Sequence, residues 1–207
     1  MITDRGEAMF ALQQTLYTSR NPTRRTLHCT RRDWIIDAIG RYGTGVRRAL
    51  EVGPGSGVYL PTLTSAAHHV VASDIESAYL DRLVDMRCEH DTLQLVRDDI
   101  TKSSFSDCSF DLVVCSEVVE HIRDSSAALR EMRRILADDG TLILSTPQRY
   151  STLEVASAVA FLPGFIQLAR RVYNEAVIKA EHINLLTRRK LREQLAIAGF
   201  VPVEEWV

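Results

Sequence analysis

A glycine-rich segment in the first third of the chain carries the clearest sign of chemistry. It reads Glu51-Val52-Gly53-Pro54-Gly55-Ser56-Gly57 and lies between a short apolar run and a stretch of helical character. Glycines in such a turn adopt positive φ angles and let the backbone approach a ligand closely. A dinucleotide fingerprint, GxGxxG, would need a third glycine where this chain has Val58, and Pro54 interrupts the loop. The segment therefore predicts a site for a ligand that has no pyrophosphate.

Acidic residues follow the glycine loop at the ends of two further apolar runs. Asp74 ends the run VVASD, and Asp98-Asp99-Ile100 ends the next run. A carboxylate at the tip of the second strand accepts hydrogen bonds from ribose hydroxyls in nucleotide-binding folds, and the carboxyl ends of parallel strands share one edge of the sheet. Either aspartate alone is equally well explained as a turn residue. Together with the glycine loop they predict one site for a ribose-containing ligand with an amino-acid tail, such as S-adenosylmethionine.

The elements that must position these residues alternate between short β-branched runs and longer amphipathic stretches, which is typical of a parallel sheet with crossover helices. Apolar runs such as LVVC and LILS favour strands buried on both faces. Strands are expected at residues 48–52, 70–74, 93–98, 110–116, 141–145 and 200–207. Helices are expected before the first strand, after the glycine loop, and at residues 76–88, 125–137 and 187–198. The pattern predicts an α/β fold: a Rossmann-like, doubly wound, mostly parallel sheet of six to seven strands with flanking helices.

The length and composition limit the class of protein. A chain of 207 residues is expected to form a single domain. The net charge of −2 argues against a general nucleic-acid binder, because nothing global attracts the protein to phosphate. The four cysteines include no CxxC pair, which favours reduced thiols in a cytoplasmic protein.

Metal-binding, secretory and membrane-spanning segments are not expected. His68-His69 and His28-Cys29 have no partners at ligand spacing, so no metal site is predicted. The first residues lack the basic start and apolar core of a signal peptide. The longest apolar stretch, residues 155–169, is broken by Pro163 and Gly164 and is shorter than the roughly 20 residues that span a bilayer.

Residues 51–121 resemble the class I S-adenosylmethionine-dependent methyltransferases, in particular the ubiquinone/menaquinone-type branch that acts on small molecules. The GPGSG loop is similar to the first motif of that family, Asp74 to its acidic ribose position, and Asp99 to its adenine-binding aspartate. The run CSEVVEH, residues 115–121, resembles the motif that lines the cofactor and substrate sites. The resemblance implies these cofactor contacts: Glu51, Gly53, Pro54, Gly55, Gly57, Asp74, Ile75, Asp99, Ile100, Cys115 and Ser116.

A closing resemblance lies at HINLLT, residues 182–187, and at the helix end before Gly199-Phe200. Members of the family usually finish with a hairpin that adds a last antiparallel strand, whereas this sequence stops after its expected sixth strand. The last antiparallel strand is either missing from this sequence or supplied another way, for example by edge pairing with a partner chain. One methyltransferase domain is expected, with an N-terminal helical cap at 1–46, a cofactor-binding core at 47–147, an apolar lid insertion at 148–183, and the last helix and strand at 184–207.

Three residues are candidates for a catalytic role in methyl transfer. A general base is needed only when the acceptor arrives protonated, as a hydroxyl does. His121, His182 and Glu117 are the candidates near the expected site, with Glu120 beside them. His121 is the first choice because an imidazole titrates near working pH. The alternative is that His121 caps or packs against the following helix.

Two segments outside the glycine loop are candidates for selecting the acceptor. Residues 19–32 hold five arginines with few acids nearby, which suits an anion site around Arg24 and Arg25 or, alternatively, a solvated helix face. Residues 150–173 are strongly apolar and follow the fifth strand, where this family commonly inserts a lid. A dimer interface and a shallow membrane contact are the alternatives for this segment. A lid with nearby arginines predicts an apolar acceptor that carries an anionic group.

The function expected from these residues and from the resemblance is methylation of a small molecule by S-adenosylmethionine. The first expectation is an O-methyltransferase of a secondary metabolite or lipid-like acceptor, with possible homodimer formation. A C- or N-methyltransferase of the same fold is an alternative. Two further alternatives are an NAD-dependent oxidoreductase, which Val58 and Pro54 disfavour, and a cofactor-binding subunit without catalysis.

Overall fold

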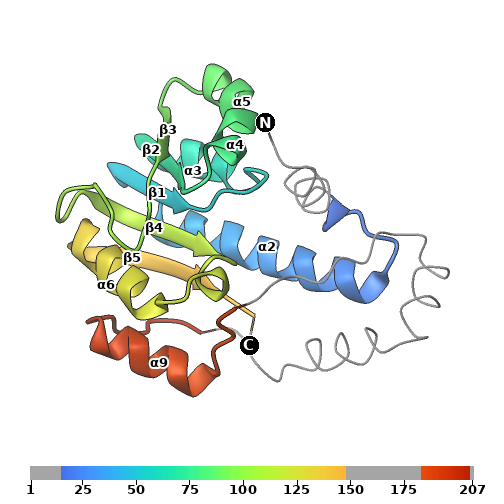
Figure 1. Ribbon diagram of the computed structural model, residues 1–207. Helices are drawn as coiled ribbons and strands as arrows, with labels where there is room; N and C mark the ends of the chain where they lie inside the picture. The colour runs from blue at the N-terminus through green and yellow to red at the C-terminus, as the bar shows by residue number, and fades with distance from the viewer. Residues whose placement is uncertain (1–14, 148–182, 206–207) are drawn as a thin grey trace.

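The computed structural model describes residues 15–147 and 183–205, and all statements about structure refer to them. A five-stranded sheet forms the centre of the molecule, with strand order β3-β2-β1-β4-β5 and every pairing parallel (Figure 1). The strands are β1 (Arg48–Val52), β2 (His69–Asp74), β3 (Leu93–Arg97), β4 (Phe110–Ser116) and β5 (Leu136–Ser145). The order reverses direction at β1, so the chain forms the doubly wound α/β sheet that the sequence predicted.

Helices connect the strands and begin at the caps that their sequences provide. They are α2 (Pro22–Tyr42), α3 (Leu60–Ala66), α4 (Ser77–Leu80), α5 (Val84–Glu89), α6 (Ser125–Ile135) and α9 (Arg188–Ile197). The side chains of Asn21, Asp124 and Thr187 cap α2, α6 and α9 by accepting backbone N–H bonds. The single helix expected at 76–88 is instead α4, a 3-10 turn at Asp81–Leu83 and α5.

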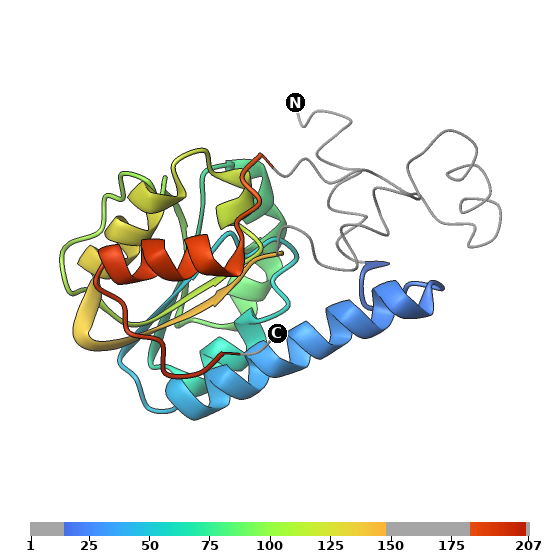
Figure 2. The ribbon, with the colours of Figure 1, turned by 90° about the horizontal axis from the view of Figure 1, so that it is seen from below.

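Two apolar clusters cover the two faces of the sheet. On one face Ile35 and Ile39 of α2 and Leu60 and Leu63 of α3 are fully buried against Ala49 and its neighbours. On the other face Met132 and Ile135 of α6 are fully buried against Leu50, Phe110 and Val113. Successive residues of a strand point to opposite faces, so one apolar run serves both clusters. Figure 2 shows α2 on one side of the sheet and α6 with α9 on the other.

The expectation of six to seven strands is wrong for the described residues. Residues 200–205 form no strand, and Val201 and Val203 are 84% and 83% exposed. Among the described residues this segment takes part in no strand pairing, and side-chain contacts hold it. Glu204 accepts from Arg41 of α2 at 2.8 Å, and Glu205 accepts from Arg188 of α9 at 2.7 Å. The segment therefore ties α9 to α2 without extending the sheet.

The expected lid, residues 148–183, lies outside the described residues except at its last position. Its role as lid, interface or membrane contact therefore stays a prediction. In the described part of the chain, none of the helices combines the length and apolar character needed to cross a membrane.

Candidate functional site

The glycine loop brings the tip of β1 against the tip of β4. Gly53 has a φ of 65°, and its N–H donates to the carbonyl of Ser73 at 2.8 Å. A Cβ atom on Gly53 would lie 2.5 Å from Cγ2 of Val118, closer than packed atoms approach. Gly57 also has positive φ, 74°, and closes the turn by donating to the Pro54 carbonyl at 2.8 Å. The loop therefore requires glycine for both its backbone angles and its close approach to β4.

Glu51, at the end of β1, is a buried carboxyl group with an unused oxygen. The residue is 2% exposed, and its Oε2 has no hydrogen-bond partner. Burial raises the pKa of Glu51 to about 8, because the ionised form loses hydration. Buried polar atoms are nearly always paired in folded proteins, so an unpaired one calls for an explanation. A ligand ammonium group beneath the glycine loop would supply the missing donor.

The tip of β2 offers a carboxylate and an exposed apolar side chain. Asp74 Oδ1 accepts from the backbone N–H of Glu76 at 2.9 Å, and burial raises the pKa of Asp74. The next residue, Ile75, is 53% exposed, and its carbonyl accepts from Arg97 Nε at 3.0 Å. An acid and an apolar surface on one strand tip suit a ribose and the flat base attached to it.

The two adjacent aspartates at the tip of β3, Asp98 and Asp99, have different surroundings. Asp98 is buried, and its carboxylate is fully engaged with Ser103 and Ser104. Asp99 is partly exposed, and its Oδ1 accepts from the N–H of Thr101 at 3.0 Å and from the hydroxyl of Thr101 at 2.7 Å. These hydrogen bonds lower the pKa of Asp99, so its carboxylate is ionised at neutral pH. Asp99 is therefore the aspartate of this pair that is open to a ligand.

Hydrogen bonds and strand register join the tips into one edge. The N–H of Asp98 donates to the carbonyl of Asp74 at 3.1 Å, which joins β3 to β2. Val52 of β1 lies opposite Ser73 of β2 and Cys115 of β4 in the parallel register. The predicted cofactor residues at β1, β2, β3 and β4 therefore meet along one edge of the sheet.

Three predicted cofactor residues face the core rather than the open edge. Cys115 is fully buried, and burial raises the pKa of its thiol. Ile100 is 6% exposed within the same apolar cluster, and Pro54 is buried in the glycine loop. Of Cys115 and Ile100, only the backbone is available to a ligand at this edge.

The tip of β4 carries Glu117, which pairs with an arginine from the N-terminal helix. Arg31 of α2 forms an ion pair with Glu117, and the two side chains are 14% and 32% exposed. Glu117 has a positive φ of 58°, and its Oε1 accepts from the Ser145 hydroxyl at 3.3 Å. Arg31 Nη2 also lies 2.9 Å from His28 Nδ1. Burial and the charge of Arg31 lower the pKa of His28 to about 4, so His28 is neutral at pH 7.

Glu120 and His121 follow in a 3-10 turn, Val119–His121. Glu120 is fully buried, and its Oε2 accepts from the Thr146 hydroxyl at 3.1 Å. Burial, and then the charge of Glu117, raise the pKa of Glu120 to about 8. His121 is exposed. His182 lies outside the described residues, although the next residue, Ile183, donates its N–H to the Glu120 carbonyl at 3.1 Å.

Two tyrosines at this site were missed by the sequence reasoning. Tyr17 forms a side-chain hydrogen bond with Tyr59, and Tyr59 forms another with Ser116 at the tip of β4. The guanidinium of Arg32 lies 5.2 Å from the centre of the Tyr17 ring, a cation–π contact. The arginine-rich segment signalled this region, but the prediction centred on Arg24 and Arg25.

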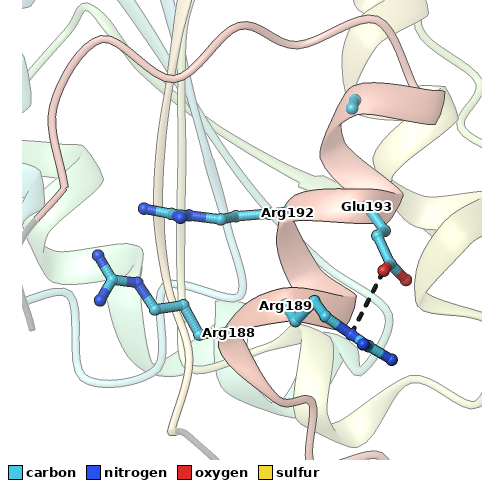
Figure 3. Close-up of a pocket in the computed structure, with 5 residues that line it drawn as sticks. Arg188, Arg189, Arg192 and Glu193 are labelled. Atoms are coloured by element: carbon cyan, nitrogen blue, oxygen red, sulfur yellow. Dashed lines mark ion pairs between the residues drawn. The ribbon is translucent and has the colours of Figure 1, made fainter.

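A hollow is lined by residues of α9, mostly arginines, and by no residue of a strand tip (Figure 3). Arg188, Arg189, Arg192 and Glu193 line it. Arg188 and Arg192 both pair with Glu205, and Arg189 lies 3.5 Å from Glu193. Each of these arginines already has an acidic partner, so the strand tips are the stronger candidate for the ligand site.

No group of three or more potential metal ligands was found within residues 15–147 and 183–205. The described edge presents carboxyl groups, hydroxyls, backbone groups and the guanidinium of Arg31.

A parallel sheet with this strand order, a glycine loop after β1 and acidic residues after β2 and β3 defines the nucleotide-type α/β class that includes the class I methyltransferases. The profile of the methyltransferase domain family matches residues 23–205. The chain belongs to this family of S-adenosylmethionine-dependent enzymes, so the predicted enzyme class and cofactor are confirmed at the level of the family.

Named relatives agree with this assignment. A probable S-adenosylmethionine-dependent methyltransferase of Mycobacterium tuberculosis (strain ATCC 25618 / H37Rv) is 27% identical over 157 residues, which cover 76% of this chain and 50% of the relative. A ubiquinone biosynthesis O-methyltransferase of Xanthomonas oryzae pv. oryzae is 32% identical over 129 residues, 59% of this chain and 51% of the relative. The chain thus spans about half the length of these curated relatives.

Solved structures share the fold at low sequence identity. The YcgJ protein of Bacillus subtilis matches with a TM-score of 0.63 and 16% identity, over 81% of this chain and 66% of that protein. The CurJ carbon methyltransferase matches with a TM-score of 0.63 and 18% identity, over 99% of this chain and 55% of that chain. At such identities the likeness shows the fold alone.

Proposed function

We propose that this chain binds S-adenosylmethionine at the tips of β1, β2 and β3 and transfers its methyl group to a small molecule. The observation that carries the proposal is the buried Glu51 carboxyl group, whose Oε2 has no partner beneath the glycine loop. The α-ammonium of the cofactor's amino-acid tail is a donor of the right charge for that oxygen. When bound, the cofactor supplies a methyl group activated by its sulfonium.

The other cofactor contacts follow from the positions of the strand tips. Backbone groups from Gly53 to Gly57 line the path of the amino-acid tail. Asp74 accepts from the ribose hydroxyls, and Ile75 provides apolar surface for the adenine. Asp99 and the backbone at Ile100 recognise the edge of the adenine, and Ser116 borders the methyl group.

The residues around the reacting centre mainly align the acceptor and exclude water. Transfer from a sulfonium consumes charge, so alignment contributes more than stabilisation of new charge. Glu117 is already paired with Arg31, which suits a positioning role better than that of a free base. His121, exposed at the same tip, remains our first choice for removing the acceptor proton, and His182 is the second.

For the acceptor we propose a hydroxyl on an apolar small molecule that carries an anionic group, as in a lipid-like or secondary metabolite. Relatives named as ubiquinone biosynthesis O-methyltransferases support oxygen as the methylated atom. Carbon and nitrogen are the alternatives for the methylated atom. Arg24 and Arg25, on the N-terminal part of α2, are the proposed anion contacts, and substituting both should raise the Michaelis constant for the acceptor alone.

Two titrations and one assay test the proposal. The protein should bind S-adenosylmethionine with one site per chain in a calorimetric titration, and NAD should produce no binding heat under the same conditions. Methyl transfer is then measured on a panel of hydroxylated and carboxylated metabolites. Binding of NAD in place of S-adenosylmethionine would overturn the cofactor assignment, and binding without transfer to any acceptor would favour a non-catalytic subunit.

The role of His121 is tested once an acceptor is known. His121→Ala should lower turnover at saturating cofactor by roughly 100-fold or more, as expected for loss of a general base. His90→Ala, in the turn after α5 and away from the strand tips, is the matched control. Near-normal turnover of His121→Ala would assign the proton transfer to another group.

A further inference from the structure

Asp98, the buried aspartate of the pair, holds the loop between β3 and β4 from the interior of the protein. Asp98 accepts from the hydroxyl of Ser103 at 2.7 Å and from the N–H and hydroxyl of Ser104 at 2.8 Å each. Asp99, one residue later, starts the turn in which Lys102 donates its N–H to the Asp99 carbonyl at 2.9 Å. The conformation of Asp99 therefore depends on where residues 103 and 104 are held.

Two side chains of α6, Glu131 and Arg134, bind the same loop from its other side. We call this pair the α6 clamp. Glu131 Oε2 accepts from the N–H of Ser103 at 2.9 Å. Arg134 donates to the carbonyl of Ser103 at 3.0 Å, to the carbonyl of Phe105 at 2.8 Å and to the Asp107 carboxylate at 2.6 Å. Both backbone polar groups of Ser103 are thus taken by the clamp.

The clamp is itself rigid and is fixed to the core. Arg134 binds Glu131 through two parallel bonds, Nε to Oε1 at 3.0 Å and Nη2 to Oε2 at 2.7 Å, a geometry that lysine cannot reproduce. Neighbouring side chains of α6, Met132 and Ile135, are fully buried against the sheet. The ring of Phe105 packs edge-on against Phe110 of β4 with centroids 5.0 Å apart. Contacts with α6 and β4 therefore fix the position of the loop.

We infer that Arg134 and Glu131 are positioning residues for the adenosine half of the cofactor. They hold residues 103–107 so that Asp99 and the backbone of Ile100 face the adenine at the edge of the sheet. Neither side chain touches the cofactor; each acts through the loop. This inference rests on the proposed function and extends it to two residues outside the strand tips.

The adjacent arginine supplies a matched control. Arg133 and Arg134 are both 31% exposed on the same helix. Among the described residues Arg133 donates to the carbonyls of Leu136 and Ala137, at the start of β5, at 3.2 and 3.4 Å, and to the Asp138 carboxylate. Replacing Arg133 removes a charge and a helix-end contact but leaves the loop as it was.

The test is calorimetric titration of the full chain with adenosine and with S-adenosylhomocysteine, at a temperature where circular dichroism shows each variant folded. Arg134→Gln should weaken both ligands by the same factor, about tenfold, as expected when a hydrogen bond to the ligand is misaligned. Arg133→Gln should leave both affinities within about twofold of wild type. Glu51→Gln should weaken S-adenosylhomocysteine but not adenosine, because it meets only the amino-acid tail.

The outcomes separate the two proposals. If the wild-type protein takes up neither ligand, the proposed function fails. If the wild type binds both and Arg134→Gln binds them equally well, the clamp only stabilises the fold and the inference is overturned. Should Arg134→Gln fail to fold, Glu131→Gln answers the same question, because it removes one carboxylate oxygen from the clamp and keeps Arg134.

Discussion

The cofactor edge is formed by the tips of β1, β2 and β3. The cap contacts are formed where α2 and the turn before it meet the tip of β4 and the start of α3. These two regions are built on different principles. At the cofactor edge each residue is placed by the strand that carries it, and neighbouring tips are joined by backbone bonds such as Gly53 to Ser73. At the cap contacts, placement comes from side chains on distant elements, through Arg31 with Glu117 and Tyr17 with Tyr59. The first region depends on backbone geometry and the second on pairing of side chains.

This difference predicts which substitutions should affect cofactor binding and which should affect stability and use of the acceptor. Backbone changes at the cofactor edge should abolish cofactor binding, because no side chain elsewhere can restore the close approach of β1 and β4. Side-chain changes at the cap contacts should leave cofactor binding intact and alter stability and acceptor use. A substitution with the opposite effect would break this comparison.

The largest effect is expected at the glycine loop. Gly53→Ala should weaken S-adenosylhomocysteine by more than about 100-fold, because the new Cβ meets Val118 at 2.5 Å and displaces the loop. Gly45→Ala is the control, since Gly45 has a φ of 80° with no atom within 4 Å of the added Cβ. It should cost about 1–2 kcal/mol of unfolding free energy from its left-handed backbone and leave binding unchanged. Normal binding by Gly53→Ala would contradict the account of the loop.

A smaller loss of affinity is expected at the tip of β2. Asp74→Ala should weaken adenosine by about 10- to 100-fold, because hydrogen bonds from a carboxylate to two ribose hydroxyls are lost. Asp85→Ala, an exposed acid on α5, removes the same charge away from the site and should change nothing. Titration with adenosine and with 2′,3′-dideoxyadenosine checks that the ribose hydroxyls are responsible. The affinity for adenosine should differ between wild type and Asp74→Ala, whereas the affinity for the dideoxy compound, which lacks these hydroxyls, should not. Equal losses for both nucleosides would point to a collapsed strand tip instead.

At the cap contacts, stability should change while cofactor affinity does not. Arg31→Gln leaves Glu117 partly buried without its cation and should lower the free energy of unfolding by about 1–2 kcal/mol. Arg41→Gln, on the same helix, breaks exposed pairs with Asp37 and Glu204 and should cost no more than about 0.5 kcal/mol. Urea unfolding and a titration with S-adenosylhomocysteine measure both quantities. A large loss of cofactor affinity in Arg31→Gln would show that Arg31 contributes to cofactor binding and would contradict this prediction.

The stability of the protein without ligand should also depend on pH. Burial raises the pKa of Glu51 and of Glu120 to about 8, above the ordinary value of 4.5. Between these values the folded state binds more protons than the unfolded chain, so the stability from these groups is full below about pH 4.5 and is lost as pH rises through 8. Urea unfolding from pH 5 to pH 8 should show this decline. The decline should be shallower in Glu51→Gln, and an identical slope would show that Glu51 is ionised when the site is empty.

The sequence predicted the positions of the strand tips well because the signals there are local. Strands β1 and β4 begin and end where expected, since a strand buried on both faces is a continuous apolar run between polar residues. Asp74 and Asp99 were identified from their place at strand ends, and parallel topology then brings the ends together. Strand β5 was expected to begin at 141 but begins at Leu136, because Leu136 pairs with Phe110 across an irregular register that no local pattern encodes.

The cap contacts could not be predicted in the same way. Arg31 and Glu117 are far apart in the sequence, and an arginine-rich stretch does not say which arginine turns inward. On one face of α2, Ile35 and Ile39 are buried against the sheet, and Arg31, one helical turn before Ile35, continues that face to the tip of β4. The helical spacing of 31, 35 and 39 was the signal that could have singled out Arg31 over Arg25. Arg24 shares this face of the helix but lies about two turns farther from Ile35 than Arg31 does.

The most direct test of the central claim is the number of protons released when the cofactor binds. Glu51 is largely protonated at pH 7 in the free protein, and a cofactor ammonium beside it should force its carboxyl group to ionise. Calorimetric titration with S-adenosylhomocysteine in two buffers of different ionisation enthalpy should report about one proton released per ligand for the wild type and none for Glu51→Gln. Binding with the same proton count in both proteins would contradict the placement of the cofactor's tail on Glu51.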